Sequence, residues 1–200
     1  MLPRVCVVVL LALGASACKG GGDAGPTGKP SVVVANAPAA TFATTSAHVE
    51  TAAPGVTGSG RVTFAAATNT IKLAGLKQAA PPFGVTDPVA MVDLLRGVVH
   101  VRSYGGAEVQ GEGTKRYEVD IDLFNAIVAT PEGPRRVELH KLDGMLGADK
   151  KLWADVFIDK AGRLRRILIP VHTDMDRPYG QSQIIPPMVS VDYSDFGGAS

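Results

Sequence analysis

The chain has 200 residues, a formal net charge of +1 at pH 7 and two cysteines. A charge so close to balance creates no field that attracts nucleic acid or an anionic lipid surface, which argues against a nucleic-acid-binding protein. The four histidines are scattered without the spacing of metal ligands, so the sequence predicts no metal site and no cofactor.

The N-terminal segment has the pattern of a bacterial export signal that ends at a cysteine. Arg4 supplies a positive charge, the apolar run Val5–Leu13 is too short to span a bilayer, and residues 14–17 are small. A cysteine directly after such residues resembles the lipobox of bacterial lipoproteins, in which the thiol is acylated and the peptide is cut before it. We therefore expect residues 1–17 to be a signal peptide and Cys18 to carry lipid at the outer face of the cell membrane. The alternative is an ordinary secretory signal that leaves Cys18 as a free thiol or an intermolecular half-disulfide.

The segment that follows is rich in glycine and proline, as is typical of a flexible tether. We expect residues 18–45 to be the lipidated cysteine and its tether, with a short helix or an extended lead-in over 31–43. Residues 46–200 then form one domain of about 160 residues, which is enough to bury a core. Cys6 leaves with the signal peptide, so the mature domain has no internal disulfide.

The first part of this domain alternates apolar and polar residues at the period of a strand. The pattern predicts strands over 46–51, 58–65 and 70–74. Thr86-Asp87-Pro88 is a helix start, because a capping side chain precedes a proline. The helix is expected over 88–96, with Gly97 placed to end it, and its apolar stripe must cover an apolar surface.

The second part of the domain predicts more strands and a helix. Strands are expected over 98–104, 107–111, 117–123, 152–158, 163–171 and 188–196, and helical spacing over 124–129 and 136–146. Tyr117–Leu123 alternates most regularly, and its row of three acids (Glu118, Asp120, Asp122) is interpreted as a solvated face because nothing converges them on a metal. The strands at 152 and 163 are apolar on both faces, which is typical of central strands. These patterns amount to about eight strands and about two or three helices.

No group of residues has the pattern of a catalytic site. No serine lies in a nucleophile elbow, and no cysteine of the mature chain is left for covalent catalysis. The sequence therefore predicts a protein that is not an enzyme, although an exported hydrolase is kept as a third hypothesis.

Several segments in series resemble the actinobacterial LppX/LprAFG lipoprotein family, whose members are similar to the lipoprotein carrier LolA. They are the TDPVAMVDLLRG helix, the strand ending KRYEVDIDL, the LWADVFIDKAGRLRRI hairpin and the terminal VSVDYSDFG strand. The resemblance implies an α+β fold, namely a strongly curved antiparallel sheet (a half-barrel) with helices covering its concave face. It also implies that the space between sheet and helices holds the acyl chains of a lipid or glycolipid.

The apolar residues of these segments are the candidate lining of such a pocket: Val89, Val92, Leu95, Val119, Ile121, Trp153 and Phe157. They equally suit a filled core. The first functional hypothesis is a membrane-anchored lipoprotein that binds, and in one version transfers, lipid or glycolipid acyl chains. The alternative is an envelope lipoprotein that binds a protein partner, as a sensor or an assembly factor; an exposed apolar patch in place of an internal cavity would favour it.

Overall fold

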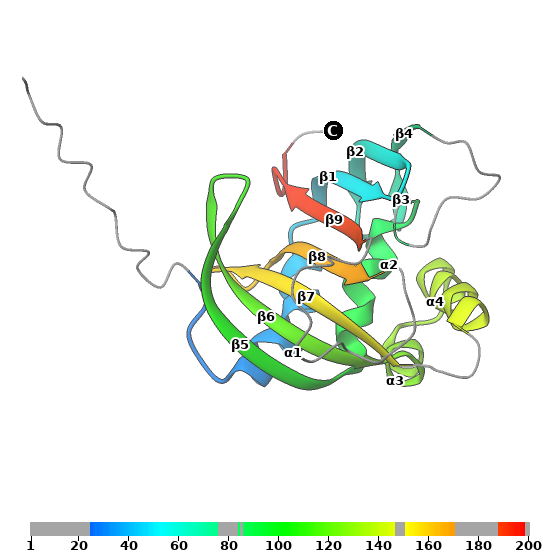
Figure 1. Cartoon of the computed structure of the whole chain (residues 1–200). Helices are drawn as coiled ribbons and strands as arrows, with labels where there is room; N and C mark the ends of the chain where they lie inside the picture. Colours follow the sequence, from blue (N-terminus) through cyan, green and yellow to red (C-terminus); the bar gives the residue numbers. More distant parts are fainter. Residues whose placement is uncertain (1–24, 76–83, 85, 147–150, 171–187, 199–200) are drawn as a thin grey trace, which may run out of the picture.

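The structure is a computed structural model that describes residues 25–75, 84, 86–146, 151–170 and 188–198 (Figure 1). Its helices are α1 (Pro30–Phe42), α2 (Pro88–Asp93), the 3-10 helix η1 (Leu94–Gly97), α3 (Leu123–Ala129) and α4 (Pro134–Leu146). Its strands are β1 (Ser46–Ala53), β2 (Val56–Thr63), β3 (Thr68–Asn69), β4 (Lys72–Ala74), β5 (Val98–Val109), β6 (Glu112–Asp122), β7 (Lys151–Asp159), β8 (Leu164–Pro170) and β9 (Met188–Ser194).

All of these strands belong to one antiparallel sheet of nine strands in the order β3-β2-β1-β9-β8-β7-β6-β5, with β4 pairing to β2 beside β3. β5 and β3 lie at opposite ends of this order, so the described sheet is open and not a closed barrel. The fold is therefore α+β with an open antiparallel sheet, which confirms the predicted fold class.

The helices pack on one face of the sheet, which we call the helix face. Every second residue of the central strands points into this layer, as shown by Tyr117, Val119 and Ile121 on β6, which belong to the hydrophobic core together with residues of α1, α2 and α4. The alternate residues point to the opposite side, which we call the open face. Such an alternation is what a pleated strand imposes.

The β5–β6 hairpin curls over the open face. Gln110, in the turn between β5 and β6, donates a hydrogen bond from Nε2 to Glu50 Oε2 on β1 over 3.1 Å. Three strands (β9, β8 and β7) separate β1 from β6 in the sheet, which in a flat sheet would hold β1 and β6 about 19 Å apart. The contact therefore requires the hairpin to bend toward the open face.

The described elements follow the order of the predicted ones, although several bounds differ: β6 begins at Glu112, and the predicted helix over 88–96 is α2 followed by η1. Two further differences concern β5 and the tether. Residues 98–104 and 107–111 were separate strands in the prediction but form the single strand β5, because a register shift between Ser103 and Gly105 carries the pairing past the glycines. Residues 30–42, assigned to the tether from sequence, form α1, whose Val33 and Val34 belong to the core. None of the helices in the described part of the chain has the length and apolar character needed to cross a membrane.

Candidate functional site

Five of the predicted pocket residues meet between the helix layer and the sheet. Val89 and Val92 lie on α2 and Leu95 on η1, while Val119 and Ile121 come from the helix face of β6. All five belong to one hydrophobic core. The structure therefore places the predicted helix against the predicted strand, in a shared core.

Trp153 and Phe157 lie on the other face of the sheet. In the register between β6 and β7, Val119 pairs with Ala154 whereas Asp120 pairs with Trp153, and directly paired residues share a face. Phe157 accordingly stands beside Arg166 on the open face, with the guanidinium carbon 5.9 Å from its ring centroid. These two aromatic residues cannot line a space shared with Val119.

The interface between helices and sheet is closely packed around the five residues. Their exposed fractions are 0–1%. Almost none of their surface is therefore accessible to water, whether from outside or from an internal cavity. All six residues of α2 are buried, and the helix therefore fills the space between the sheet and the neighbouring helices with side chains, at the density usual for protein interiors. An acyl chain can enter this layer only if α2 or η1 moves.

Polar contacts hold α2 on the sheet. Tyr193 Oη, on the helix face of β9, donates a hydrogen bond to the carbonyl of Pro88 over 2.6 Å. Burial raises the pKa of Tyr193 well above its ordinary value, so the phenol remains a donor. Asp87 caps the helix by accepting a hydrogen bond from the Ala90 amide over 3.2 Å. The N-terminal end of this short helix is thus fixed by two hydrogen bonds in addition to apolar packing.

A buried carboxylate joins α2 to the other helices. Asp93 is fully buried and accepts a hydrogen bond from Arg96 Nε over 2.7 Å, while Arg135 Nη1 of α4 lies 3.3 Å from its Oδ2. Both guanidinium groups also stack near the ring of Phe42 on α1, at 5.7 Å and 4.4 Å from its centroid. Burial raises the pKa of Asp93, and the two arginines oppose that shift without cancelling it. This cluster ties α1, α2, η1 and α4 together.

Sequence reasoning did not single out Asp93. The available signal was an acid inside the apolar stripe of the segment PVAMVDLLRG, where a buried charge needs a partner. One partner, Arg96, lies three residues further on in the same segment, but the other, Arg135, lies in a separate helix, and a single sequence does not reveal that second pairing.

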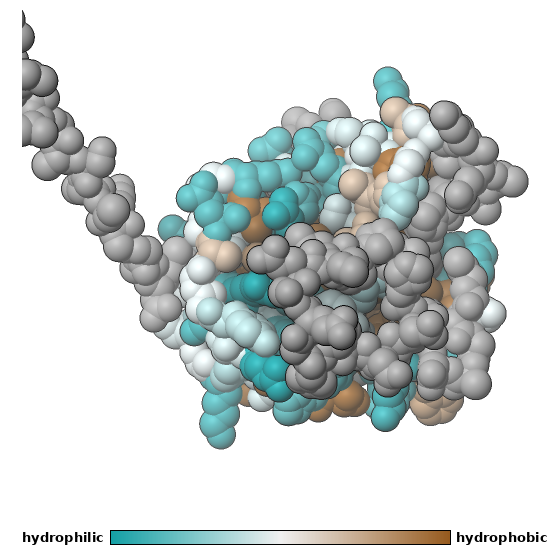
Figure 2. Space-filling view, in the orientation of Figure 1, coloured by the Kyte–Doolittle hydropathy of each residue, from teal (hydrophilic) through white to brown (hydrophobic). Residues whose placement is uncertain are grey.

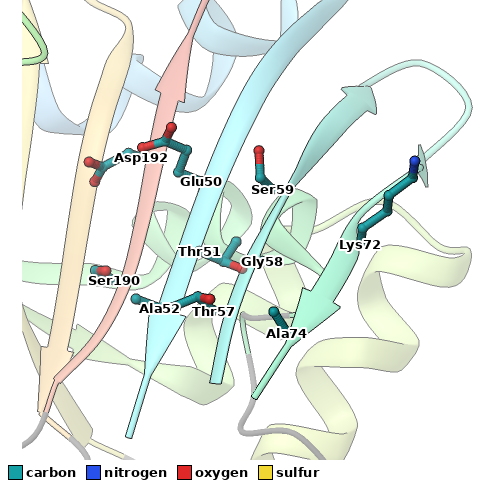
Figure 3. A pocket seen from close by; sticks show the side chains of 10 residues that line it. All are labelled: Glu50, Thr51, Ala52, Thr57, Gly58, Ser59, Lys72, Ala74, Ser190 and Asp192. Carbon is teal, nitrogen blue, oxygen red and sulfur yellow. The ribbon is translucent and has the colours of Figure 1, made fainter. Parts of the chain in front are cut away.

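A second candidate site is a groove on the open face, above β9, β1, β2 and β4 (Figure 3). Its volume is about 460 Å³, and it is lined by Glu50, Thr51, Ala52, Thr57, Gly58, Ser59, Lys72, Ala74, Ser190 and Asp192. Glu50 and Asp192 are direct neighbours in the register of β1 and β9. Asp192 is neutralised by Arg166, whose Nε lies 2.6 Å from its Oδ1, and Glu50 accepts the hydrogen bond from Gln110. The groove therefore presents hydroxyl groups and carboxylates beside apolar surface, which includes Ala52 and Ala74.

The groove also contains a serine beside a histidine. Ser59 Oγ lies 3.3 Å from His48 Nε2, and the pair is exposed. Nucleophilic catalysis by such a pair needs a third group that orients the histidine, and among the contacts of the described residues no carboxylate does so for His48. The pair therefore does not revive the hydrolase hypothesis.

Comparison with known proteins finds similar solved structures but no matching family model or curated sequence. No protein-family model and no curated protein sequence matches the chain. Similar solved structures include LprF from Mycobacterium bovis, with a TM-score of 0.52 and 14% identity over 88% of this chain and 96% of LprF. The Mycobacterium tuberculosis lipoprotein LppX gives a TM-score of 0.48 and 14% identity over 85% of this chain and 96% of LppX. The chain has the fold of LprF.

The LprF fold agrees with the architecture that the sequence resemblance implies, an open antiparallel sheet with helices packed on it. At 14% identity the likeness concerns the fold, so the roles of individual residues come from this chain's own geometry. In this chain the apolar layer is filled by α2, and the open face carries a groove of mixed polar and apolar lining.

Proposed function

We propose that this chain is a cell-envelope lipoprotein, acylated at Cys18, whose domain binds the acyl chains of a lipid or glycolipid between its helices and its sheet. Three observations support the proposal: the lipobox-like sequence before Cys18, the fold shared with LprF, and the continuous apolar layer between α1, α2, α4 and the sheet. The apolar layer in the LprF fold is the observation that carries it.

The proposed domain organisation follows from the same observations. Residues 1–17 are removed as a signal peptide, and the tether starts at Cys18 and ends before α1 at Pro30, because α1 is part of the core. The folded domain then extends from α1 to the C-terminal strand. The protein is held at the outer face of the cell membrane.

Binding in this layer requires α2 and η1 to act as a movable plug. Their side chains, including Val89, Val92 and Leu95, occupy the apolar space against Val119 and Ile121. When they move away, they leave a surface of the same character, on which an alkyl chain is stabilised by about 0.8 kcal/mol per buried methylene. Trp153 and Phe157 take no part because they lie on the open face.

The test is lipid binding by the mature protein, followed by mapping. Native mass spectrometry of the protein purified from actinobacterial cells should show a co-purifying lipid, and a fluorescent fatty acid should bind saturably. A photoactivatable acyl probe should then label α2, η1 and β6, whereas Trp153 and Phe157 on the open face provide the internal control. Absence of both co-purifying lipid and saturable binding would refute the proposal, and labelling confined to the open face would move the site.

The second candidate function is binding of a protein partner, without lipid transport. It is favoured by the close packing around α2 together with exposed apolar side chains such as Val99, Phe124 and Val128, and by the groove on the open face. A photocrosslinker placed at Ser59, in the groove, should then capture a specific envelope protein in cells, while the same group at Glu132, on the exposed loop before α4, should not. Equal capture from both positions would count against this function.

A further inference from the structure

Exposed apolar side chains collect on the edge of the domain formed by β5. The described residues include six large hydrophobic side chains that are about half exposed or more. Four of them form what we call the β5-edge patch: Val32 (53%) in the first turn of α1, Val99 (57%) on β5, and Phe124 (61%) and Val128 (60%) on α3. In Figure 1 the start of α1, β5 and α3 lie along the lower edge of the molecule, and Figure 2 shows hydrophobic atoms interspersed with hydrophilic ones there.

Local geometry explains why these side chains point outward. Val99 lies in a register shift of the edge strand, between Val98 and His100, which turns it out of the ladder. Phe124 and Val128 are one helical turn apart on α3, so they share a face. The opposite side of α3 packs so closely on η1 that a Cβ at Gly97 would lie 2.7 Å from the Ala126 amide nitrogen. The exposed face of α3 is therefore fixed by the packing of its other face.

The other two exposed hydrophobic residues behave differently. Tyr104 is engaged on the open face, where its hydroxyl donates to Glu118 and Arg116 stacks over its ring at 5.1 Å. Val137 lies on α4, which packs on α2 and α3 and not on β5. Val137 thus provides a matched control, since it is an exposed apolar side chain away from the β5 edge.

The described structure begins near one end of β5. Gly25 lies against Lys115 of β6, which pairs with Gly106, toward the opposite end of β5 from Val99, and α1 packs on β5. The eight residues from Cys18 to Gly25 reach at most about 29 Å when fully extended. A lipid at Cys18 therefore keeps the Gly106 end of β5 within one short tether length of the bilayer, and the rest of the edge reaches the bilayer when β5 lies along it.

We propose that the β5 edge rests on the membrane surface, with Val32, Val99, Phe124 and Val128 in the headgroup region of the bilayer. The inference builds on the lipid anchor at Cys18 of the proposed function. Once the anchor is inserted, contact of the patch with lipid is an intramolecular step, so a few apolar side chains suffice to orient the domain. Exposed Lys29 and Lys151 flank the patch, and Lys151 pairs with Asp122 at the start of α3.

This orientation has consequences for both candidate sites. η1 leads directly into Val98 of β5, so the proposed acyl-binding layer has its η1 end at the membrane. The groove above β1, β2 and β4 lies toward the opposite edge of the sheet. A lipid can thus pass between membrane and domain without crossing water.

Single-cysteine labelling tests the orientation. Both natural cysteines lie in the N-terminal segment, Cys6 being lost with the signal and Cys18 blocked by lipid, so an introduced cysteine is the only free thiol. The variants Val99→Cys, Phe124→Cys and Val128→Cys carry an environment-sensitive fluorophore, and Val137→Cys and Lys72→Cys are the controls. The lipidated protein is reconstituted in vesicles of phosphatidylglycerol and phosphatidylethanolamine.

The expected result is a blue shift and an increase in emission of about twofold or more at the three patch positions, with no change at the two controls. Emission that changes equally at all five positions, or at none, overturns the proposal. The second outcome includes the case in which the patch serves a protein partner, because these vesicles contain only lipid.

The mass of the N-terminal peptide distinguishes failure of the lipid anchor from failure of the proposed membrane contact. If the N-terminal peptide of the mature protein carries no lipid, the anchor at Cys18 is wrong, and the thiol of Cys18 is instead coupled to a maleimide lipid in the same vesicles. Hydrogen exchange should then slow in α3 and not in β3 and β4. Unchanged exchange in α3 overturns the docking of the β5 edge whatever the source of the anchor.

Discussion

Tyr193 Oη donates a hydrogen bond over 2.6 Å to the carbonyl oxygen of Pro88, and this bond joins the last strand of the sheet to the first residue of α2. It is the direct polar link between the helix face of β9 and the element that fills the apolar layer. Because the two residues are 105 positions apart in the chain, the bond also secures the fold over a long sequence separation.

Replacing Tyr193 by phenylalanine should lower the free energy of unfolding by about 1–3 kcal/mol, because the Pro88 carbonyl then stays buried without a donor. Urea unfolding followed by the fluorescence of Trp153, the single tryptophan of the chain, measures the change. Tyr104→Phe is the control, since Tyr104 is about half exposed and its hydroxyl can exchange protein partners for water, for an expected cost below about 0.5 kcal/mol. Equal losses in the two variants would contradict the role of the Tyr193 bond.

The same substitution should strengthen acyl binding. If α2 must move to admit an alkyl chain, every 1.4 kcal/mol removed from its attachment raises the apparent affinity by roughly tenfold, until the open state predominates. A fluorescent fatty acid titrated into Tyr193→Phe and into the natural sequence measures the ratio. An unchanged dissociation constant in a folded variant would show that α2 stays in place when lipid binds.

Gly60 should not tolerate a side chain. A Cβ on Gly60 would lie 2.6 Å from the carbonyl oxygen of Thr70 and 2.7 Å from Cα of Ile71, where the chain crosses β2 between β3 and β4. Because both neighbours are backbone atoms, Gly60→Ala should destabilise the domain by about 1–3 kcal/mol. Gly106→Ala on β5 is the matched control, because nothing lies within 4 Å of its Cβ position. Thermal unfolding of both variants gives the comparison, and a neutral Gly60→Ala would contradict the close crossing.

Two local patterns were sufficient to predict the elements that carry the acyl-binding proposal. The alternation of Tyr117–Leu123 gave β6 and the side of the strand that is buried, because only one of its faces is apolar. The Asp87-Pro88 pair predicted the start of α2, and in the structure the Ala90 amide donates the capping hydrogen bond to Asp87. Both signals depend on neighbouring residues in the chain, and they can therefore be recognised from the sequence.

The faces of β7 were not predictable in the same way. Trp153 and Phe157 stand among apolar residues at successive positions of the segment LWADVFI, so periodicity does not say which set meets the helices. Only the register between β6 and β7 identifies the set that meets the helices, because it pairs Asp120 with Trp153 and Val119 with Ala154. The curl of the β5–β6 hairpin onto Glu50 is likewise a property of the whole sheet and leaves no local signal.

Asp159 should make the domain sensitive to acid. It accepts hydrogen bonds from the amides of Ala161 and Arg163 and from the side chains of Arg163 and Arg165, at 2.8–3.0 Å. Burial opposes its charge, but these bonds outweigh burial and lower the pKa of Asp159 below its ordinary value of 3.8. The stability it contributes is therefore complete above pH 3.8 and is lost as the pH falls through the lower folded value.

Asp159→Asn should accordingly cost about 3 kcal/mol at pH 7, because it leaves two arginines facing an uncharged amide. The difference in unfolding free energy between variant and natural sequence should shrink as the pH is lowered from 5 toward about 2. Asp195→Asn, at an exposed position after β9, controls for the loss of one carboxylate. A difference that stays constant over this range would show that folding does not lower the pKa of Asp159.

Asp93 should respond to acid with the opposite sign. Burial raises its pKa above 3.8 in spite of Arg96 and Arg135, so the folded state takes up a proton at a pH where the unfolded chain has not yet done so. The contribution of Asp93 to the free energy of unfolding then rises as the pH falls from neutrality through the raised folded value, and it levels off below 3.8. Unfolding of the natural sequence and of Asp93→Asn between pH 7 and about pH 4 should isolate this rise, because the asparagine variant lacks the titrating group.

The opposite signs of the two slopes distinguish the two buried carboxylates. Asp159 has enough donors to remain charged, whereas Asp93 is held by two arginines that also stack on Phe42. A slope of the same sign for both would mean that Arg96 and Arg135 compensate the burial of Asp93 in full, and that the junction of α1, α2, η1 and α4 carries no electrostatic strain.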